Sequence, residues 1–273
     1  MGDTRPLITF LSDYGHADEL VGICHGVIAE RCPQARVIDI THGIAPFDVR
    51  GGALALRSAL RFIPAGVHLA VVDPGVGSDG RRAVALRISE AERLLVGPDN
   101  GLLMLAAAEL GGVDEAADIG ESRHRIEPVS ATFHGRDIFA PVAAALAAGS
   151  PLSDVGAAFD PAELVVLELP AARIEGGTLV AHALVIDRFG NITLNAASGK
   201  LEEMGLEHGA QLTVEVAGRR LTGRYARTFA DVAAGELLLY EDSRRDLALA
   251  KNLGSAAEVL GLWLDDELRL TVE

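Results

Sequence analysis

Apolar segments of two lengths alternate over the first 150 residues of the chain. Five short apolar runs have the length of buried strands: 7–12, 35–40, 67–73, 83–88 and 93–97. Four longer segments have the length or apolar spacing of helices: 18–31, 48–62, 99–110 and 137–148. Strands that alternate with helices predict a mostly parallel sheet covered by helices on both faces.

The pattern changes near residue 150, where GSPLSDVGAAFDPAEL is rich in turn formers. From about 163 onward the apolar runs are short and separated by Gly-containing turns: TLVAHALVID, QLTVEVAG, RRLTGRYA, GELLLYED and LRLTV. This pattern predicts a smaller all-β domain, a barrel. With the boundary between 160 and 175, we assign residues 1–165 to an α/β domain and residues 172–273 to the β-barrel domain.

Composition and charge argue against nucleic-acid-binding and membrane proteins. The chain has 273 residues, 49% of them hydrophobic, and a net charge of −15. Nucleic-acid binding usually needs a basic face, so this charge argues against it. No apolar run approaches the ~20 residues that span a bilayer, and residues 1–15 lack the layout of a signal peptide. Cys24 and Cys32 are not spaced as a C-x-x-C site. We therefore expect a soluble, cytoplasmic protein with no membrane or nucleic-acid partner.

One Gly-rich segment imitates a dinucleotide-binding motif. Gly75, Gly77 and Gly80 in DPGVGSDG spell G-x-G-x-x-G directly after a predicted strand. A dinucleotide site needs a helix to begin inside that turn. The next segment, RRAVALRI, has the pattern of another strand, so we expect a hairpin connection rather than a nicotinamide or flavin site.

Two aspartates follow the first predicted strand, in SDYGHAD at 12–18. In open α/β sheets, ligands bind outside the carboxyl ends of the strands, where Asp13 and Asp18 are expected. A carboxylate has two acceptor oxygens and can take both hydroxyls of a ribose cis-diol. Alternatively, Asp18 starts the following helix and Asp13 holds a turn.

A second set of candidate groups lies in VVDPGVG and ATFHGRDIFAP. Asp73 ends another predicted strand and is followed by Arg81 and Arg82, and a carboxylate with a guanidinium can orient a water. His134 precedes a predicted helix, and His is the commonest acid–base residue near neutral pH. The small Gly135 lets a ligand approach the backbone. The alternatives are a surface salt bridge and a capping or partly buried histidine.

The predicted barrel contributes two polar turns. Asp187, Phe189 and Asn191 lie in IDRFGNITLN, and an aromatic beside an amide and a carboxylate suits a nucleobase and an amine. Ser243 and Arg244 precede an apolar strand, and an Arg can hold a carboxylate with two parallel hydrogen bonds. The alternatives are an ordinary hairpin and a solvated charge cluster.

Seven segments together resemble one family: SDYG, ITHGI-P-DV, VVDPGVG, GPDNGLL, TFHGRDIFAP, IDRFGN and S-R-x(6)-N. The chain is similar to the S-adenosylmethionine (SAM) hydroxide adenosyltransferases, or SAM hydrolases, relatives of the fluorinase and chlorinase. The resemblance runs in order from about 7 to 262. It implies a Rossmann-like N-terminal domain, a C-terminal β-barrel, and a homotrimer with a site at each junction between subunits.

The resemblance also implies roles for individual residues. Asp73, Arg81 and His134 match the family's water-handling triad, with Arg82 as the alternative arginine because the loop SDGRR carries one extra residue. Further residues are expected to bind the substrate: Asp13 at the ribose, Asp18, Phe47, Phe133, and the adenine- and amino-acid-end residues Asp187, Phe189, Asn191, Ser243 and Arg244.

Two positions separate the hydrolases from the halogenating relatives. In the fluorinase, a serine stands at the position of Gly135 and a tyrosine at that of Asp73. A carboxylate at position 73 would repel a halide, whereas it can accept a hydrogen bond from water. The resemblance therefore implies hydrolysis of SAM at the 5′ carbon, giving adenosine and methionine.

The sulfonium of SAM makes methionine a good leaving group, so we expect no cofactor and no metal. Three alternatives remain: a halogenase of the same fold, a non-catalytic SAM or adenosine sensor, and a metallohydrolase using His42, Asp73 and His134. We interpret the other histidines as structural or exposed: His16, His25, His68, His124, His182 and His208.

Overall fold

The structure is a computed structural model and describes residues 5–89 and 92–272. The chain divides into two units, Met1–Leu167 and Glu168–Glu273. Each unit has its own apolar core among the described residues. Among these residues, no helix combines the length and the apolar composition needed to cross a membrane.

The described part of the first unit contains a seven-stranded sheet with the order β2-β1-β3-β5-β4-β6-β7. Its strands are β1 (Leu7–Ser12), β2 (Arg36–Thr41), β3 (Val67–Val71), β4 (Ala83–Ile88), β5 (Arg93–Pro98), β6 (Val113–Asp118) and β7 (Ala157–Phe159). The β2–β1, β1–β3 and β3–β5 pairings are parallel, and the other three are antiparallel. Because β6 runs in the direction of β5, five of these strands share one direction. This confirms the mostly parallel sheet.

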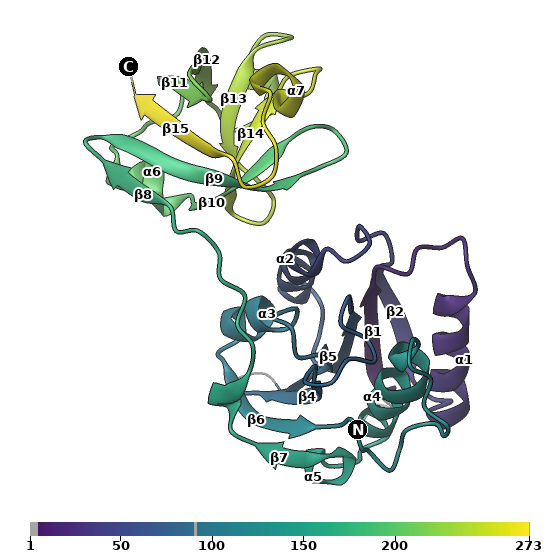
Figure 1. Cartoon of the computed structure of the whole chain (residues 1–273). Helices are drawn as coiled ribbons and strands as arrows, with labels where there is room; N and C mark the ends of the chain where they lie inside the picture. Colours follow the sequence, from purple (N-terminus) through teal and green to yellow (C-terminus); the bar gives the residue numbers. More distant parts are fainter. Residues whose placement is uncertain (1–4, 90–91, 273) are drawn as a thin grey trace. The chain divides into compact units, whose positions relative to one another are not determined.

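Helices cover both faces of this sheet (Figure 1). The helices α1 (Leu20–Arg31) and α4 (Ala140–Ala147) pack on one face, and α2 (Val49–Leu60) and α3 (Met104–Glu109) pack on the other. Alternate residues of a strand serve the two faces: Phe10 packs with α1 and α4, and Leu11 with α2. Phe10 is fully buried, and truncation of such a residue to Ala costs about 3–5 kcal/mol.

Some elements differ from the sequence-based expectation. The helix expected over 99–110 begins only at Met104, because Gly101 takes a positive φ of 92° in the preceding turn. The helix expected over 137–148 begins as a π-helical turn, η1 (Gly135–Phe139), before α4. Three short elements were not anticipated: β6, β7 and the helix α5 (Leu152–Val155). The β6 sequence VDEAAD carries three acids, which hides its strand character.

The expected hairpin between the strands at 67–73 and 83–88 is wrong. β3 and β4 are not neighbours in the sheet, because β5 lies between them and pairs with both. The loop after β3 therefore passes the end of β5 before the chain returns antiparallel as β4. The other half of the expectation is confirmed, since a strand and not a helix follows the Gly-rich turn.

The second unit contains a closed barrel, as predicted. Its strands are β8 (Arg173–Glu175), β9 (Thr178–Ile186), β10 (Ile192–Ala197), β11 (Gln211–Val216), β12 (Arg219–Tyr225), β13 (Leu237–Glu241), β14 (Asp246–Lys251) and β15 (Glu267–Val272). The order is β10-β14-β13-β12-β11-β15-β9-β8, and the β10–β9 pairing closes a ring of seven described strands. Closure removes unpaired strand edges within that ring. Two short helices interrupt the predicted all-β pattern, α6 (Gly199–Glu203) and α7 (Ala256–Leu260), besides the 3₁₀ turn η3 (Phe229–Asp231). A second 3₁₀ turn, η2 (Pro161–Glu163), belongs to the first unit.

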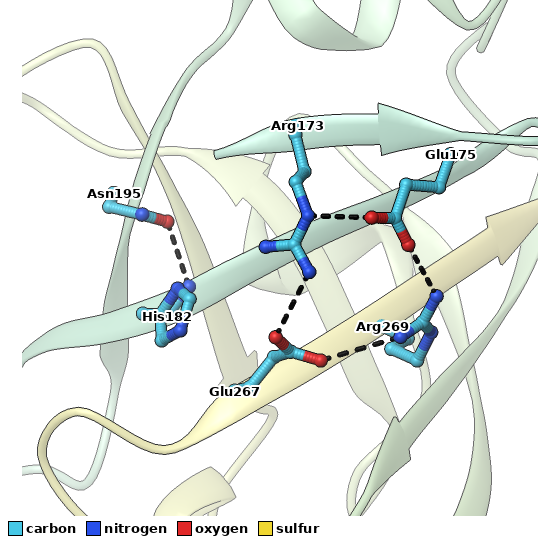
Figure 2. Close-up of polar contacts among 6 residues, drawn as sticks. All are labelled: Arg173, Glu175, His182, Asn195, Glu267 and Arg269. Atoms are coloured by element: carbon cyan, nitrogen blue, oxygen red, sulfur yellow. Dashed lines mark hydrogen bonds and ion pairs between the residues drawn. The ribbon is translucent and has the colours of Figure 1, made fainter. Parts of the chain in front are cut away.

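A ring of four charged side chains joins β8 to β15 on the barrel surface (Figure 2). Arg173 donates to Glu175 at 2.7 Å and to Glu267 at 3.3 Å. Arg269 donates to the same two carboxylates, at 2.8 and 3.4 Å. All four side chains are more than two-fifths exposed, so solvent screens these ion pairs.

Candidate active site

Three of the predicted residues meet in the first unit. Arg81 Nη2 lies 3.1 Å from Asp73 Oδ2 and also donates to His134 Nδ1. The Arg81 and Asp73 side chains are only 8% and 5% exposed. Arg81 has no acceptor atom, so His134 Nδ1 must accept, and a neutral His134 then carries its hydrogen on Nε2. The contact thereby fixes which atom of the imidazole can donate.

The topology explains why these residues converge. Asp73 follows β3, and β1 and β3 are parallel neighbours whose carboxyl ends lie at one edge of the sheet. Arg81 comes two residues before β4, and because β4 runs antiparallel to β5, its beginning lies at that same edge. His134 directly precedes η1, which leads into α4, and α4 packs on β1 and β3. The guanidinium of Arg81 also lies 5.5 Å from the centre of the buried Phe139 ring.

Burial dominates the electrostatics of this cluster. Desolvation raises the pKa of Asp73, and the nearby Asp13 carboxylate raises it further, while the Arg81 charge opposes both. Desolvation and then the Arg81 charge lower the pKa of His134 below its usual value. At neutral pH the imidazole is therefore neutral. The Asp73 carboxylate is held close to a cation and is a stronger base than an exposed aspartate.

The cluster borders a cavity of about 270 Å³. Its wall includes Asp13, Phe47, Asp73 and His134, together with residues that the sequence analysis did not single out: Tyr14, Leu20, Pro46, Val71, Val76 and Thr132. Arg81 and His134 also line a larger and more polar cavity of about 1060 Å³. His134 therefore borders both spaces, whereas Asp73 borders only the smaller one.

Asp13 holds one wall of the smaller cavity in place. Its Oδ2 accepts the backbone amide of Phe47 at 2.9 Å, which leaves Oδ1 for a ligand. Phe47 has a φ of 68°, a conformation that residues other than glycine rarely adopt, and its side chain is 70% exposed. Strain of this kind persists only where the surroundings enforce it and often marks a binding site. The Asp13 contact supplies part of that enforcement.

Tyr14 and Gly135 form a close contact within the wall. A Cβ atom at position 135 would lie 2.1 Å from the Tyr14 hydroxyl oxygen, so any larger residue there requires Tyr14 to move. Burial raises the pKa of Tyr14 well above its usual value, and Cys24, Asp13 and Asp73 add to the shift. The phenol is therefore neutral at neutral pH. Its place in the SDYG segment, directly after Asp13, was the sequence signal for this residue.

The neighbouring arginine has other partners. Arg82 Nε lies 3.0 Å from Asp99 Oδ2, and its two terminal nitrogens contact Glu163 at 3.1 and 2.7 Å. Its guanidinium stacks 4.3 Å from the centre of the Phe159 ring. The structure thus places Arg81, and not Arg82, beside Asp73 and His134.

Two other predicted residues lie outside the cavity wall. Asp18 is exposed in the turn before α1. Phe133 packs edge-on against Tyr14, with ring centres 5.9 Å apart, and lies under the guanidinium of Arg136. Phe133 therefore packs against Tyr14, which lines the cavity, and does not line the cavity itself. His42, considered for a metallohydrolase, contacts Ser12 and Asp39 instead.

In the second unit, Asp187 organises the turn between β9 and β10. Its Oδ1 accepts the backbone amides of Phe189 and Asn191 at 2.8 and 2.9 Å, and its Oδ2 accepts Asn191 Nδ2 at 2.9 Å. Phe189 is 62% exposed, and Arg188 lies over its ring. The turn presents an aromatic face beside an amide whose oxygen remains available to a ligand.

The turn between β13 and β14 carries the other two predicted residues. Asp242 Oδ1 accepts the backbone amide of Arg244 at 2.8 Å, and Ser243 is exposed. The two turns are linked through neighbouring strands, because β10 pairs with β14 and Thr193 Oγ1 lies 3.5 Å from Asp242 Oδ2. Burial raises the pKa of Tyr240, in β13, to about 12, and the carboxylates of Asp242 and Asp187 both contribute.

The comparisons with known proteins agree over nearly the whole chain. Residues 8–156 match the model of the SAM hydroxide adenosyltransferase N-terminal domain, and residues 181–269 match that of the C-terminal domain. A protein from Salinispora tropica named (R)-S-adenosyl-L-methionine hydrolase is 51% identical, over 97% of this chain and 98% of the relative. A fluorinase from an Actinoplanes species is 31% identical over 93% of each chain. A solved structure of an uncharacterized conserved protein from Thermotoga maritima has a TM-score of 0.90 and 36% identity, covering 97% of this chain and 99% of that one.

Proposed function

Because the chain belongs to the SAM hydroxide adenosyltransferase family, we propose that it hydrolyses SAM at the 5′ carbon to adenosine and L-methionine. The observation that carries the proposal is the buried contact of Arg81 with Asp73 and His134 at a cavity that Asp13 also lines. This geometry suits a bound water. Relatives that are 51% and 41% identical and are named (R)-S-adenosyl-L-methionine hydrolases support the same reaction.

The reaction needs an activated water and little else. The oxygen of water forms a bond to C5′ while the C5′–S bond breaks. The electron pair of the C5′–S bond goes to sulfur, which becomes the neutral thioether of methionine. The leaving group needs neither a proton nor a Lewis acid, so we propose a reaction without a metal or cofactor. Alignment of a nucleophile in a closed site contributes up to about 7–11 kcal/mol in favourable cases.

The geometry suggests a distinct role for each member of the triad. His134 Nδ1 accepts from Arg81, so its Nε2–H can donate to the water oxygen and orient a lone pair. Asp73 then accepts the proton of the water, because its raised pKa makes it the stronger base. Arg81 holds both side chains and stabilises negative charge that develops on the oxygen.

Water is favoured over halide by two features of the wall. The Asp73 carboxylate would repel a halide ion, as the sequence predicted. In addition, the Tyr14 hydroxyl occupies the space into which a side chain at position 135 would extend. A serine donor at 135, as in the fluorinase, is therefore excluded while Tyr14 keeps its place.

We propose that the substrate is held by groups from both units. Asp13 Oδ1 would bind the ribose hydroxyls, with the exposed Phe47 against the ligand. In the barrel unit, Asp187, Phe189, Asn191, Ser243 and Arg244 would hold the adenine and the amino-acid end. For Asp18 and Phe133, the contacts support a structural role more than a direct one.

Product analysis tests the function. Purified protein incubated with SAM should release adenosine and methionine in equal amounts, with and without EDTA, and in ¹⁸O-labelled water the label should enter the adenosine 5′-hydroxyl. A 5′-halogenated adenosine formed in chloride or fluoride would identify a halogenase. Intact SAM after long incubation would identify a binding protein. Activity that EDTA abolishes and zinc restores would overturn the metal-free mechanism.

We further propose a cytoplasmic homotrimer whose sites each combine two chains. The support is the family resemblance, together with the division of the ligand-binding groups between two units. At a SAM concentration far below the dissociation constant of Asn191→Ala, His134→Ala and Asn191→Ala should each have little activity alone. Mixing the two under subunit exchange should then restore activity, because some sites would combine two intact halves. Mixtures that stay inactive, or a monomer by light scattering, would contradict this assembly.

A further inference from the structure

Three metal-ligating side chains meet away from the proposed triad, in the first unit. His25 lies on α1, Asp39 on β2, and His42 in the loop after β2. His25 Nε2 lies 2.8 Å from Asp39 Oδ1, and His42 Nε2 lies 3.1 Å from the same oxygen. One ligand atom from each residue lies within 4.8 Å of the others. In tetrahedral zinc sites, ligand atoms about 2.0–2.1 Å from the ion are separated by somewhat more than 3 Å.

The environment of His42 leaves its Nε2 available as a ligand atom within the cluster. Its side chain is fully buried, and the contact of Nε2 with a described residue is the one to Asp39 Oδ1 at 3.1 Å, which is poorly aligned for a hydrogen bond. A buried, unpaired nitrogen is costly, so most such atoms bind a partner, a water or an ion. This nitrogen faces a carboxylate and a second imidazole.

The remaining contacts hold the two imidazoles in place. Ser12 Oγ lies 2.7 Å from His42 Nδ1, and when Nδ1–H donates to that oxygen, Nε2 carries a free lone pair. The Phe10 ring packs against both imidazoles, with ring centres 4.6 Å from His42 and 6.1 Å from His25. His25 and Asp39 are each 37% exposed, so an ion can enter from solvent.

We propose that His25, Asp39 and His42 form a binding site for a divalent transition-metal ion of the zinc class. Two imidazole nitrogens and one carboxylate oxygen are ligands that zinc prefers, whereas Mg²⁺ and Ca²⁺ require mostly oxygen. A water completes the fourth position. To bind, His25 carries its hydrogen on Nδ1 so that Nε2 faces the ion. None of the three residues lines the cavity of the proposed active site.

The position of the site indicates a structural role. An ion there links α1, β2 and the loop that leads from His42 to Phe47, whose amide Asp13 binds. A ligand that binds only the folded state stabilises it. The ion therefore raises the melting temperature and is not required for hydrolysis.

The test uses the full-length protein without an affinity tag. After EDTA treatment and its removal, calorimetric titration with Zn²⁺ should show one tight site per chain, and Co²⁺ should give the visible spectrum of a tetrahedral complex. Zn²⁺ should raise the melting temperature, whereas Mg²⁺ should not. His25→Ala and Asp39→Asn alter half-exposed side chains, and each should weaken Zn²⁺ binding by more than about tenfold.

His208→Ala is the matched control, because His208 is an exposed histidine on the barrel unit. It should bind Zn²⁺ as the unaltered protein does. Zn²⁺ binding that the His25 and Asp39 variants retain, or the absence of a one-to-one site in the folded protein, would overturn the proposal. In that case the three side chains form only a hydrogen-bonded cluster.

Discussion

The candidate site residues of the two units differ in burial and in their hydrogen-bond partners. At the cavity of the α/β unit, Asp73 and Arg81 are nearly inaccessible to solvent and have shifted pKa values. In the barrel unit, Asp187 is engaged within its own turn, and Phe189 and Ser243 are exposed. The α/β unit therefore holds buried charges with perturbed pKa values. The barrel unit presents surface turns whose shape is held by hydrogen bonds within each turn.

This difference suggests a division of labour between chemistry and binding. Buried charges cost folding free energy and are kept where a reaction needs perturbed groups. Turns whose polar groups are hydrogen-bonded within the turn keep their shape without a ligand. They therefore lose little conformational entropy when a ligand binds. We therefore expect changes in the Asp73, Arg81 and His134 triad of the α/β unit to act on the rate of the chemical step, and changes in the barrel turns to act on affinity.

The largest effect should come from the triad. His134→Ala and Asp73→Asn should each lower kcat by about 10²-fold or more, because each removes a group that holds or deprotonates the water. The SAM dissociation constant should change far less. Steady-state kinetics and calorimetric binding of SAM measure both quantities.

Arg82→Ala is the matched control for Arg81→Ala. Arg82 contacts Asp99 and Glu163, so its removal should leave kcat near that of the unaltered protein, while Arg81→Ala should behave as the other triad variants do. The reverse result would assign the catalytic role to Arg82 and contradict the role proposed for Arg81.

The next effect tests the packing of the cavity wall. Gly135→Ala places a methyl group 2.1 Å from the Tyr14 oxygen, so Tyr14 must move, and we expect kcat/KM to fall by about tenfold or more. Tyr14→Phe in the same chain removes that oxygen, and the remaining ring atoms lie 3.1 and 3.2 Å from the methyl position. The double variant should therefore recover part of the lost activity.

Gly26→Ala is the control for this substitution. Gly26 lies in α1 with open space around its Cβ position, so alanine should be neutral or stabilising by about 0.5–1 kcal/mol. If Gly135→Ala behaves like Gly26→Ala in kinetics and thermal unfolding, the Tyr14 contact is not a constraint on the wall.

A smaller effect should appear in the pH dependence of kcat/KM. In the proposed mechanism Asp73 must be ionised to accept the proton of the water, so the rate should rise with pH through the raised pKa of that carboxyl group. Asp13→Asn removes a like charge and should move this acidic limb to lower pH. Arg81→Met removes a cation and should move it to higher pH. Shifts in the same direction in both variants would exclude Asp73 as the titrating group.

The smallest effect should come from the barrel surface. The Arg173, Glu175, Glu267 and Arg269 side chains are well exposed, so Arg269→Ala should change the free energy of unfolding by about 1 kcal/mol or less. Urea unfolding at low and high salt measures the difference, which should shrink as salt rises. A large loss, independent of salt, would show that the barrel depends on this ring.

Periodicity and strand ends predicted much of the fold and of the site. The alternation of strand and helix predicted the sheet and its two helical layers, and the position after a strand indicated Asp13 and Asp73. These inferences succeed because the edge of a parallel sheet collects whatever follows each strand. The barrel was predicted from short strands and turns, although α6 and α7 were not.

Contacts between distant segments could not be predicted from the sequence. Arg81 and Arg82 are adjacent in the sequence, but in the fold Arg81 lies beside Asp73, whereas Arg82 contacts Asp99 and Glu163. The fit of Tyr14 against Gly135, and the meeting of His25 with His42, depend on how helices pack on the sheet. Such contacts leave no periodic signal in a single sequence.

The division of labour is tested most directly by comparing His134→Ala with Asn191→Ala. For each variant, the SAM dissociation constant and the single-turnover rate at saturating SAM are measured on the same preparation. We predict that His134→Ala retains SAM affinity and loses the chemical step, whereas Asn191→Ala weakens affinity and keeps most of the rate at saturation. Equal losses of rate in both variants, with affinity unchanged in both, would contradict the account.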